Sequence, residues 1–400
     1  MTARAEPLPP PVTSQGPAAW LRENLFNSWY NSIFTIVIGA GLAVFAVLAA
    51  RWLVEARWGV LLVNMRLFLI GQYPLEQAWR IWLSLAILSL LAGASAAVGG
   101  AAVRSLAMWL AAGQVLVAAL VLVADMPLGA AVALLANAGL VWLAYYAALR
   151  VPPPTRLLGA AWLLSIPLYG LLLAGVGGTP LVEVRSLLWG GLLLTFVLAI
   201  SSIVLSFPLG VLLALGRRSD LPAIRIVCTV YIEAVRGVPL VSILFMAAVM
   251  LQLFLPGDLR IDALLRAIGG LTIFTAAYVA ENVRGGLQAI PLGQLEAANA
   301  IGLNPLQRNL YIVLPQALRA VIPANVGLFI SLLKDTTLVF VAGGGLLELL
   351  GIGRSVLAQS QFFGAHMEVY VFISAVFFIM CYAMSQASYR LEAAMGVGRR

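Results

Sequence analysis

Residues 281–315 read ENVRGGLQAIPLGQLEAANAIGLNPLQRNLYIVLP, and this stretch is the most informative in the chain. Pro291 suits the first turn of a helix because its missing N–H would have no partner there, and the Ala-rich run after it favours a helix. Gly302 then provides a turn, and Asn304 can cap a second helix that we expect Pro315 to disturb. The stretch therefore predicts a short helical hairpin, and the segments around it decide where that hairpin lies.

Long apolar runs surround this hairpin. Of the 400 residues, 62% are hydrophobic and 10% are charged, which is too little polar surface to cover a soluble globule. A helix needs about 20 residues to cross a hydrocarbon core about 30 Å thick, and its backbone groups must be paired within the helix. Ten runs meet this requirement, at residues 33–54, 81–103, 107–124, 128–148, 157–176, 187–215, 226–252, 263–283, 320–342 and 368–389. The sequence thus predicts an all-α polytopic membrane protein of about ten transmembrane helices.

Arginine is distributed unevenly around these runs, and cations are held on the cytoplasmic side during membrane insertion. With the N-terminus inside, fourteen Arg residues fall on the cytoplasmic side and eight on the outer side. We therefore expect both termini and the hairpin to be cytoplasmic. Several of the outer Arg residues lie in residues 55–80 together with Trp and Tyr, so we expect this stretch to form an interfacial helix rather than a plain loop.

The reactive residue types limit the chemistry of the chain. The sequence holds one His and two Cys, so His-ligated metal sites and Ser–His–Asp or Cys–His nucleophiles lack the residues they need. A Walker-type phosphate loop needs Gly-Lys followed by Ser or Thr, whereas Lys334, the one Lys, stands between Leu and Asp. We therefore expect no enzyme activity, metal or cofactor in this chain. The net charge of +8 is nearly all Arg, which in so apolar a chain is more typical of cytoplasmic membrane faces than of nucleic-acid binding.

A Gly/Pro cluster at residues 175–180 marks a boundary between five apolar runs and five more. Residues 1–30 are rich in Pro and are expected to form a disordered cytoplasmic tail. Residues 31–180 are expected to form an N-terminal membrane extension of about five helices, with scattered polar side chains and no motif that carries chemistry. Residues 185–392 form the remaining segment, which contains the hairpin at 291–315.

The hairpin resembles the EAA loop of permease subunits in bacterial ATP-binding-cassette (ABC) importers. The positions that match the motif at its spacing are Glu296, Ala297, Ala298, Gly302, Ile312, Leu314 and Pro315. The phrases YIEAVRGVPL (231–240) and SLLKDTTL (331–338) resemble the polar amino acid branch of this family. The likeness to the family core covers residues 185–392, and the extension before it resembles the M subunit of general L-amino-acid systems.

This resemblance implies a type I importer fold, in which two permease subunits each give a five-helix core and two ATPase subunits lie beneath. The second permease is expected to be a related but different chain. A periplasmic solute-binding protein would deliver the substrate, with a broad range of L-amino acids expected. The ATPase subunits would bind ATP and Mg, and their closure would drive alternating access across the lipid of the bacterial cytoplasmic (inner) membrane.

The resemblance also assigns roles within the hairpin. The EAA helix would dock in a cleft of the ATPase, with Glu296 as its polar anchor. Ala297 and Ala298 would permit close approach, and Gly302 would set the turn. The residues themselves support this interpretation. An exposed amphipathic hairpin outside a helix bundle is better explained as a helix that binds in a groove of a partner protein than as an ordinary loop.

Five further residues are candidates for the translocation pathway or a gate: Lys334, Asp335, Thr336, Glu233 and Arg236. Adjacent helical residues project about 100° apart, so Lys334 and Asp335 cannot both face one point of a cavity. A Lys near the end of a span often extends to the headgroups, whereas a charge inside the membrane is a functional candidate by default. Both interpretations stay open for this pair. Glu233 and Arg236 are three residues apart on one helical face, and a structural ion pair is the favoured interpretation.

Three alternatives compete with an amino-acid permease. A related importer for another small polar solute would have the same motif. A polytopic membrane enzyme, such as a lipid-modifying transferase, would need several carboxylates or His at one membrane face, and the sequence lacks that cluster. A passive channel would leave the hairpin without a purpose.

Overall fold

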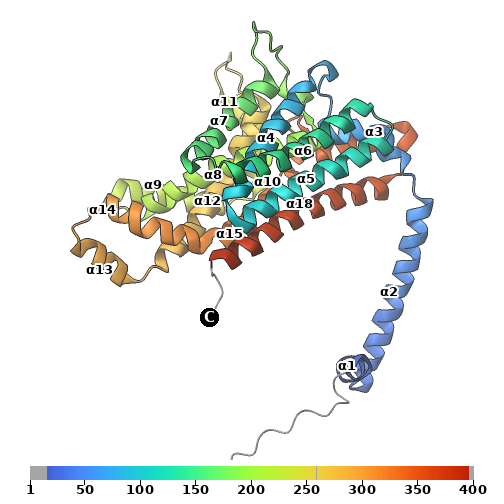
Figure 1. Cartoon of the computed structure of the whole chain (residues 1–400), viewed down its shortest axis with the longest axis horizontal. Helices are drawn as coiled ribbons and strands as arrows, with labels where there is room; N and C mark the ends of the chain where they lie inside the picture. Colours follow the sequence, from blue (N-terminus) through green and yellow to red (C-terminus); the bar gives the residue numbers. More distant parts are fainter. Residues whose placement is uncertain (1–15, 258, 396–400) are drawn as a thin grey trace, which may run out of the picture. The chain divides into compact units, whose positions relative to one another are not determined.

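The computed structural model describes residues 16–257 and 259–395, and this part of the chain is almost entirely helical (Figure 1). Within it, nine helices are long and apolar enough to cross a membrane, or ten if one bent helix pair counts as a span. The chain divides into two compact units, Met1–Trp58 and Gly59–Arg400. The predicted all-α polytopic membrane fold is therefore confirmed.

The described part of the first unit consists of two helices, α1 (Pro17–Asn24) and α2 (Trp29–Glu55). Residues 1–15 of the predicted disordered tail lie outside the described residues, and α1 shows that the rest of that tail contains helix. No side chain of α2 is buried, and its mean hydropathy reaches 2.6. A helix that is apolar on all sides suits a lipid environment.

The second unit begins with helices that correspond to the predicted extension. Their bounds are α3 (Gly59–Ile70), η2 (Leu75–Gln77), α4 (Trp79–Val98), α5 (Gly100–Val123), α6 (Leu128–Arg150) and α7 (Thr155–Ala174). The helices α4, α5 and α6 pack on one another, and α7 packs on α4. Because α3 has twelve residues, it reaches about 18 Å and is too short to span a bilayer. Instead it buries Val60, Met65 and Phe68 against its neighbours, so the predicted helix is present, whereas its interfacial position stays a prediction.

The remaining elements form the core. Their bounds are η3 (Ser186–Leu188), α8 (Gly191–Arg217), α9 (Pro222–Arg236), α10 (Leu240–Phe245), η4 (Met246–Met250), α11 (Leu251–Phe254), α12 (Ala263–Gln288), α13 (Leu292–Ala300), α14 (Pro305–Gln307), η5 (Arg308–Val313), α15 (Leu314–Asp335), α16 (Leu338–Val341), β1 (Leu347–Glu348), α17 (Leu349–Leu357), η6 (Ser360–Phe362) and α18 (His366–Met395). The most deeply buried of the long helices is α12, which packs against α8, α9 and α15. Small residues allow this close packing, since a Cβ on Gly210 of α8 would lie 2.5 Å from the Val279 side chain of α12.

Two of the predicted spans differ from the structure. The run 226–252 is not one straight helix, because α9 and the helix from Leu240 to Phe254 meet at 105°. The break contains Gly237 and Pro239, and a residue before Pro is forced out of the helical region. The run 320–342 is interrupted where α15 ends at Asp335, and the short α16 follows.

The predicted boundary near residue 180 lies inside the second unit, where hydrogen bonds join its two sides. The guanidinium of Arg80 donates to the carbonyl of Val182 (2.8 Å). The backbone N–H of Val184 donates to the carbonyl of Ala174 (2.7 Å). The extension and the core are therefore joined through this loop.

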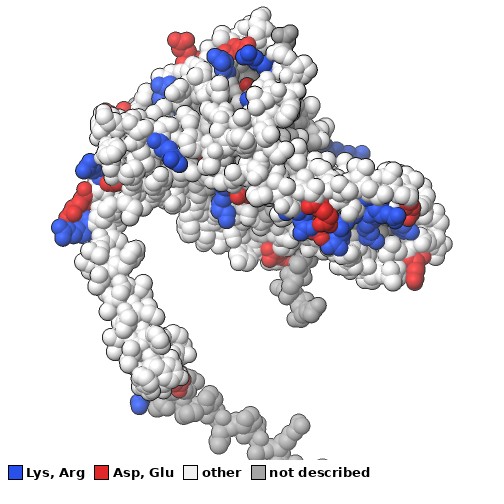
Figure 2. Space-filling model, turned by 180° about the vertical axis from the view of Figure 1, so that it is seen from behind, with Lys and Arg blue, Asp and Glu red and all other residues white. Residues whose placement is uncertain are grey.

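Charged side chains cover only part of the surface of the second unit. Figure 2 shows Lys, Arg, Asp and Glu gathered in patches, with broad uncharged surface between them. Large apolar side chains are exposed on the long helices, among them Leu163 and Leu164 of α7, each 70% exposed. Apolar surface of this extent is stable next to lipid and not in water, so the protein is a multi-pass membrane protein.

Glu348 ends β1 and caps α17. Its side chain is fully buried, and its carboxylate accepts hydrogen bonds from the backbone N–H groups of Leu350 (2.7 Å) and Gly351 (3.0 Å). Burial outweighs these two hydrogen bonds and raises the pKa of Glu348 to about 7.

We expect this carboxyl group to make the free energy of unfolding fall as pH rises from about 4.5 to about 7. The folded chain keeps the Glu348 proton up to the higher pH, so the contribution is complete below the unfolded pKa and is lost through the folded pKa. The shift corresponds to about 3 kcal/mol. Thermal unfolding of the wild type and of Glu348→Gln in detergent, at about pH 5 and about pH 8, measures it. An equal pH slope in both proteins would contradict the assignment.

Candidate functional site

The predicted hairpin is present, and its first arm is α13. Pro291 is the N-cap, and the helix ends in a turn at Gly302, whose φ is +80°. The N–H of Leu303 donates to the carbonyl of Ala298 (3.2 Å), and the N–H of Gly302 donates to the carbonyl of Asn299 (3.0 Å). This pair of bonds is a Schellman motif, which needs a left-handed residue at the position of Gly302.

The second arm begins with the cap predicted at Asn304. The Asn304 side chain accepts from the N–H of Gln307 (2.9 Å), and the Gln307 side chain accepts from the N–H of Asn304 (3.1 Å). This capping box fixes the start of α14. The disturbance expected at Pro315 is present, because the regular α-helix gives way to the π-helical turn η5, which ends two residues before Pro315. The helical path does not end there and continues into α15.

The hairpin is held to the bundle by a few buried side chains. Ala298 is 3% exposed, and Leu295 packs against a buried cluster that includes Val313 and Ala317. The guanidinium of Arg308 donates to Asn299 Oδ1 (3.1 Å) and so joins the two arms. Figure 1 shows α13 and α14 extending away from α12 and α15, which they connect. The arrangement gives a well-defined hairpin with one side anchored.

The other side of the hairpin is exposed and apolar. The exposed fractions are 75% for Leu292, 73% for Ile301 and 69% for Tyr311. Glu296 lies on the same exposed helix and forms no ion pair with any residue that the structure describes. Exposed apolar side chains, together with a carboxylate that has no ion pair among the described residues, suit a protein interface better than a free surface.

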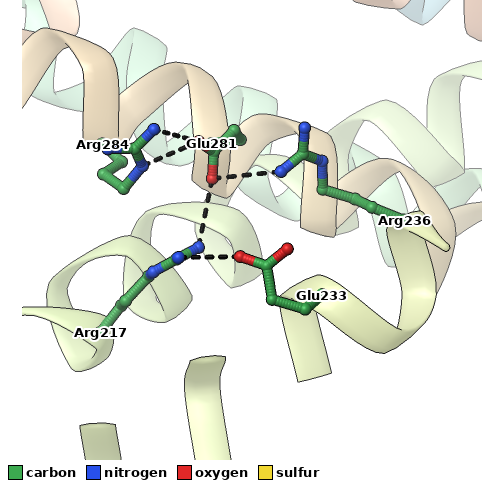
Figure 3. Close-up of polar contacts among 5 residues, drawn as sticks. All are labelled: Arg217, Glu233, Arg236, Glu281 and Arg284. Atoms are coloured by element: carbon green, nitrogen blue, oxygen red, sulfur yellow. Dashed lines mark hydrogen bonds and ion pairs between the residues drawn. The ribbon is translucent and has the colours of Figure 1, made fainter. Parts of the chain in front are cut away.

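A cluster of charges lies where α8, α9 and α12 meet (Figure 3). Glu281 is its centre and pairs with Arg217 (3.3 Å), with Arg236 (3.4 Å) and, at a short distance, with Arg284. Arg217 also pairs with Glu233 (2.8 Å). The predicted ion pair between Glu233 and Arg236 is therefore wrong, because each of the two residues pairs with a different helix.

This cluster connects the core helices next to the hairpin. Arg217 ends α8 and Arg236 ends α9, whereas Glu281 lies near the end of α12 and is 20% exposed. Arg218 adds a hydrogen bond to the carbonyl of Leu287 (3.1 Å), four residues before Pro291. Any movement of the hairpin must therefore act on helix ends that one carboxylate holds together.

Arg217 and Glu281 are not among the site residues predicted from the sequence. A signal was present, since Glu281 and Arg284 are three residues apart, as ion-paired residues on one helix face are. The partners from α8 and α9 are distant in sequence and required the fold.

The candidates at the end of α15 are not brought into this cluster. Thr336 is fully buried, and its hydroxyl donates to the carbonyl of Leu333 (2.7 Å). Lys334 is exposed, whereas Asp335 is half-buried, and neither forms an ion pair within the described part of the chain. Their role in the pathway stays a prediction.

A bundle of apolar helices that ends in a charged cluster and an exposed hairpin is the architecture expected of a transport permease subunit. Residues 206–395 match the family described as "Binding-protein-dependent transport system inner membrane component". The chain is 38% identical to the glutamate/glutamine/aspartate/asparagine transport system permease protein BztC of Rhodobacter capsulatus, over 98% of this chain and 96% of that protein. It is 34% identical to the inner membrane amino-acid ABC transporter permease protein YhdY of Escherichia coli, over 98% and 97%.

The chain therefore belongs to the family of binding-protein-dependent transport system inner membrane components, the permease subunits of ABC importers, and the resemblance seen in the hairpin motif is confirmed. The probable glutamine ABC transporter permease protein GlnP of Bacillus subtilis is 35% identical, over 52% of this chain and 94% of that protein. Among solved structures, one described as an amino acid ABC transporter with histidines has 30% identity and a TM-score of 0.45, over 51% of this chain and 92% of that chain.

Proposed function

We propose that the chain moves amino acids across a bacterial cytoplasmic membrane by alternating access, driven by ATPase subunits that bind its hairpin. The observation that carries this proposal is the hairpin itself, a helical turn with exposed Leu292, Ile301 and Tyr311 and with Glu296, which forms no ion pair with a described residue. Relatives named as permeases of amino-acid systems support the substrate class. A broad range of L-amino acids is our proposal, and another small polar solute is the alternative.

The proposed assembly follows from the same family. ATPase subunits would bind ATP and Mg beneath the membrane, a second, related permease would complete the pathway, and a periplasmic binding protein would deliver the substrate. The chain itself would be no enzyme. Its N- and C-termini and the hairpin would be cytoplasmic, as the Arg distribution predicts.

The roles proposed for individual residues depend on their geometry. Glu296 would meet a cationic or hydrogen-bonding group of the ATPase, and the small Ala297 would allow close approach. Ala298 is buried in the hairpin itself, so its small size serves the packing of the two arms. Leu314 and Pro315 would carry the movement of the hairpin into α15, which begins there.

Crosslinking tests this proposal. The two native cysteines, Cys228 and Cys381, are first replaced by Ser, and Ile301→Cys then places one thiol on the hairpin. We expect a bifunctional crosslinker to join this chain to an ATPase subunit, with a yield that changes when ATP is added. Leu163→Cys is the matched control, because Leu163 is 70% exposed and lies within α7, a candidate span of the N-terminal extension. Crosslinks to an ATPase from both positions, or from neither, would contradict the proposal.

A further inference from the structure

A cavity of about 2490 Å³ lies within the second compact unit, between the N-terminal helices and the core. Its walls come from α4, α5 and α7 on one side and from α8, α12 and α18 on the other. Along α4 the wall runs from Ile81 to Ser95, a length of about 21 Å at 1.5 Å per residue. This depth exceeds half of a hydrocarbon core about 30 Å thick, so the cavity can hold acyl chains from one leaflet.

The depth of the cavity is apolar. Side chains such as Leu88, Leu110 and Phe196 line it, and the polar groups at its far end are paired, since Trp162 Nε1 donates to Ser95 Oγ (2.9 Å). An empty space of this size would deprive the wall atoms of dispersion contacts, and water would find few polar partners there. Lipid is the apolar molecule that a membrane supplies to such a space.

The opposite end of the cavity, which we call the mouth, lies where α4, α8 and α12 begin and α7 ends. The hydroxyl of Ser186 donates to Asp262 Oδ2 (2.7 Å), and this bond brings the loop of Arg185 next to the segment of Arg260. Both guanidiniums are exposed at the mouth and form no ion pair with a described residue. Glu183 also lies at the mouth and is likewise without an ion pair among the described residues.

Polar atoms without partners continue from the mouth into the cavity. Trp189 lines it, is 3% exposed, and its indole N–H has no hydrogen-bond partner in the described part of the chain. The hydroxyl of Ser84 and, further in, Gln114 Oε1 also have no hydrogen-bond partner in the described part of the chain. Ser84 and Trp189 each lie within five residues of the helix ends that form the mouth. Buried polar atoms without partners usually have a ligand or water to meet.

We propose that this cavity binds a glycerophospholipid. The lipid phosphate lies at Arg185 and Arg260, because guanidinium groups pair with phosphate oxygens in a bidentate way. The indole N–H of Trp189 donates to an ester oxygen, and the acyl chains fill the apolar depth along α4 and α8. The lipid thereby packs the seam between the extension and the core. This inference requires a membrane-embedded chain and does not depend on the ATPase, the substrate or the orientation proposed above.

Native mass spectrometry of the full-length chain in mild detergent tests the proposal. The chain is depleted of lipid and then titrated with phosphatidylethanolamine, or with diacylglycerol that has the same acyl chains and no phosphate. Phosphatidylethanolamine is chosen because Glu183 at the mouth can accept its ammonium group. We expect one bound phospholipid per chain, with an affinity about tenfold or more above that of diacylglycerol. Equal binding of the two lipids, or no retained lipid, would overturn the proposal.

Variants test the phosphate site at the mouth of the cavity and the acyl-chain site in its depth separately. Arg185→Gln with Arg260→Gln is expected to lower phospholipid affinity about tenfold and leave diacylglycerol binding unchanged. Arg51→Gln with Arg354→Gln removes the same charge elsewhere and should change neither. Gly113 and Gly170 line the cavity, and a Cβ on either meets nothing within 4 Å, so we expect Gly113→Leu with Gly170→Leu to direct apolar side chains into the space. This last variant should fold, as shown by an unchanged elution profile, and exclude lipid. Phospholipid retained at wild-type affinity by both the mouth and the depth variants would refute the site.

Discussion

Gly302→Asp should abolish ATP-driven uptake while the chain still inserts in the membrane. Gly302 holds the left-handed position of the Schellman turn, with a φ of +80° and nothing within 4 Å of an added Cβ. Backbone strain at such a position costs about 1–2 kcal/mol for an ordinary residue and less for Asp or Asn. The larger effect comes from the new carboxylate, which lies six residues from Glu296 on a surface that we propose enters an ATPase cleft. We expect uptake in vesicles to fall by about tenfold or more.

Gly302→Asn is the matched control for this prediction. Asn has nearly the shape of Asp, visits the left-handed region as readily and carries no charge. We expect it to retain most of the uptake, whereas Gly302→Val, which is strained and bulky, should lose it through the turn. Wild-type uptake by Gly302→Asp would argue against a role of this surface in coupling. Equal losses in the Asp and Asn variants would assign the effect to the shape of the turn and not to charge.

The sequence predicted this hairpin well because its determinants are local. Pro291 at the start, Gly302 at the left-handed position and Asn304 at the second cap each act within a few residues. The long apolar runs were equally readable, since their length and composition suffice. The bend inside the run 226–252 was missed, because a break of three residues that includes Pro239 hardly changes the mean hydropathy of a run.

The charged cluster could not be predicted in the same way. Its members come from the ends of α8, α9 and α12, and their pairing depends on how α9 turns back at the bend after Arg236. The spacing rule for ion pairs within one helix predicts that Glu233 pairs with Arg236. In the folded chain each of them pairs with a residue on another helix. The spacing of residues within one helix does not show whether a charged side chain pairs with a neighbour on that helix or with a residue that is distant in sequence.

Glu281→Ala should lower the stability of the core more than any other substitution in this cluster. The change leaves Arg217, Arg236 and Arg284 close together without the carboxylate that they share. Glu281 is 20% exposed, so water screens the three charges only in part. Removing one partner of a largely buried ion pair costs about 3 kcal/mol or more. We expect a lower Tm in detergent and reduced uptake, because the ends of α8 and α9 are released from α12.

Glu233→Ala is the control, since Glu233 is 55% exposed and, among the residues that the structure describes, forms an ion pair with Arg217 only. An exposed ion pair contributes about 0–1 kcal/mol, so the Tm should change little. Sodium chloride discriminates further, because screening should relieve the repulsion in Glu281→Ala and partly restore its Tm, with little effect on Glu233→Ala. If both variants unfolded at the wild-type temperature, the cluster would contribute no net stability.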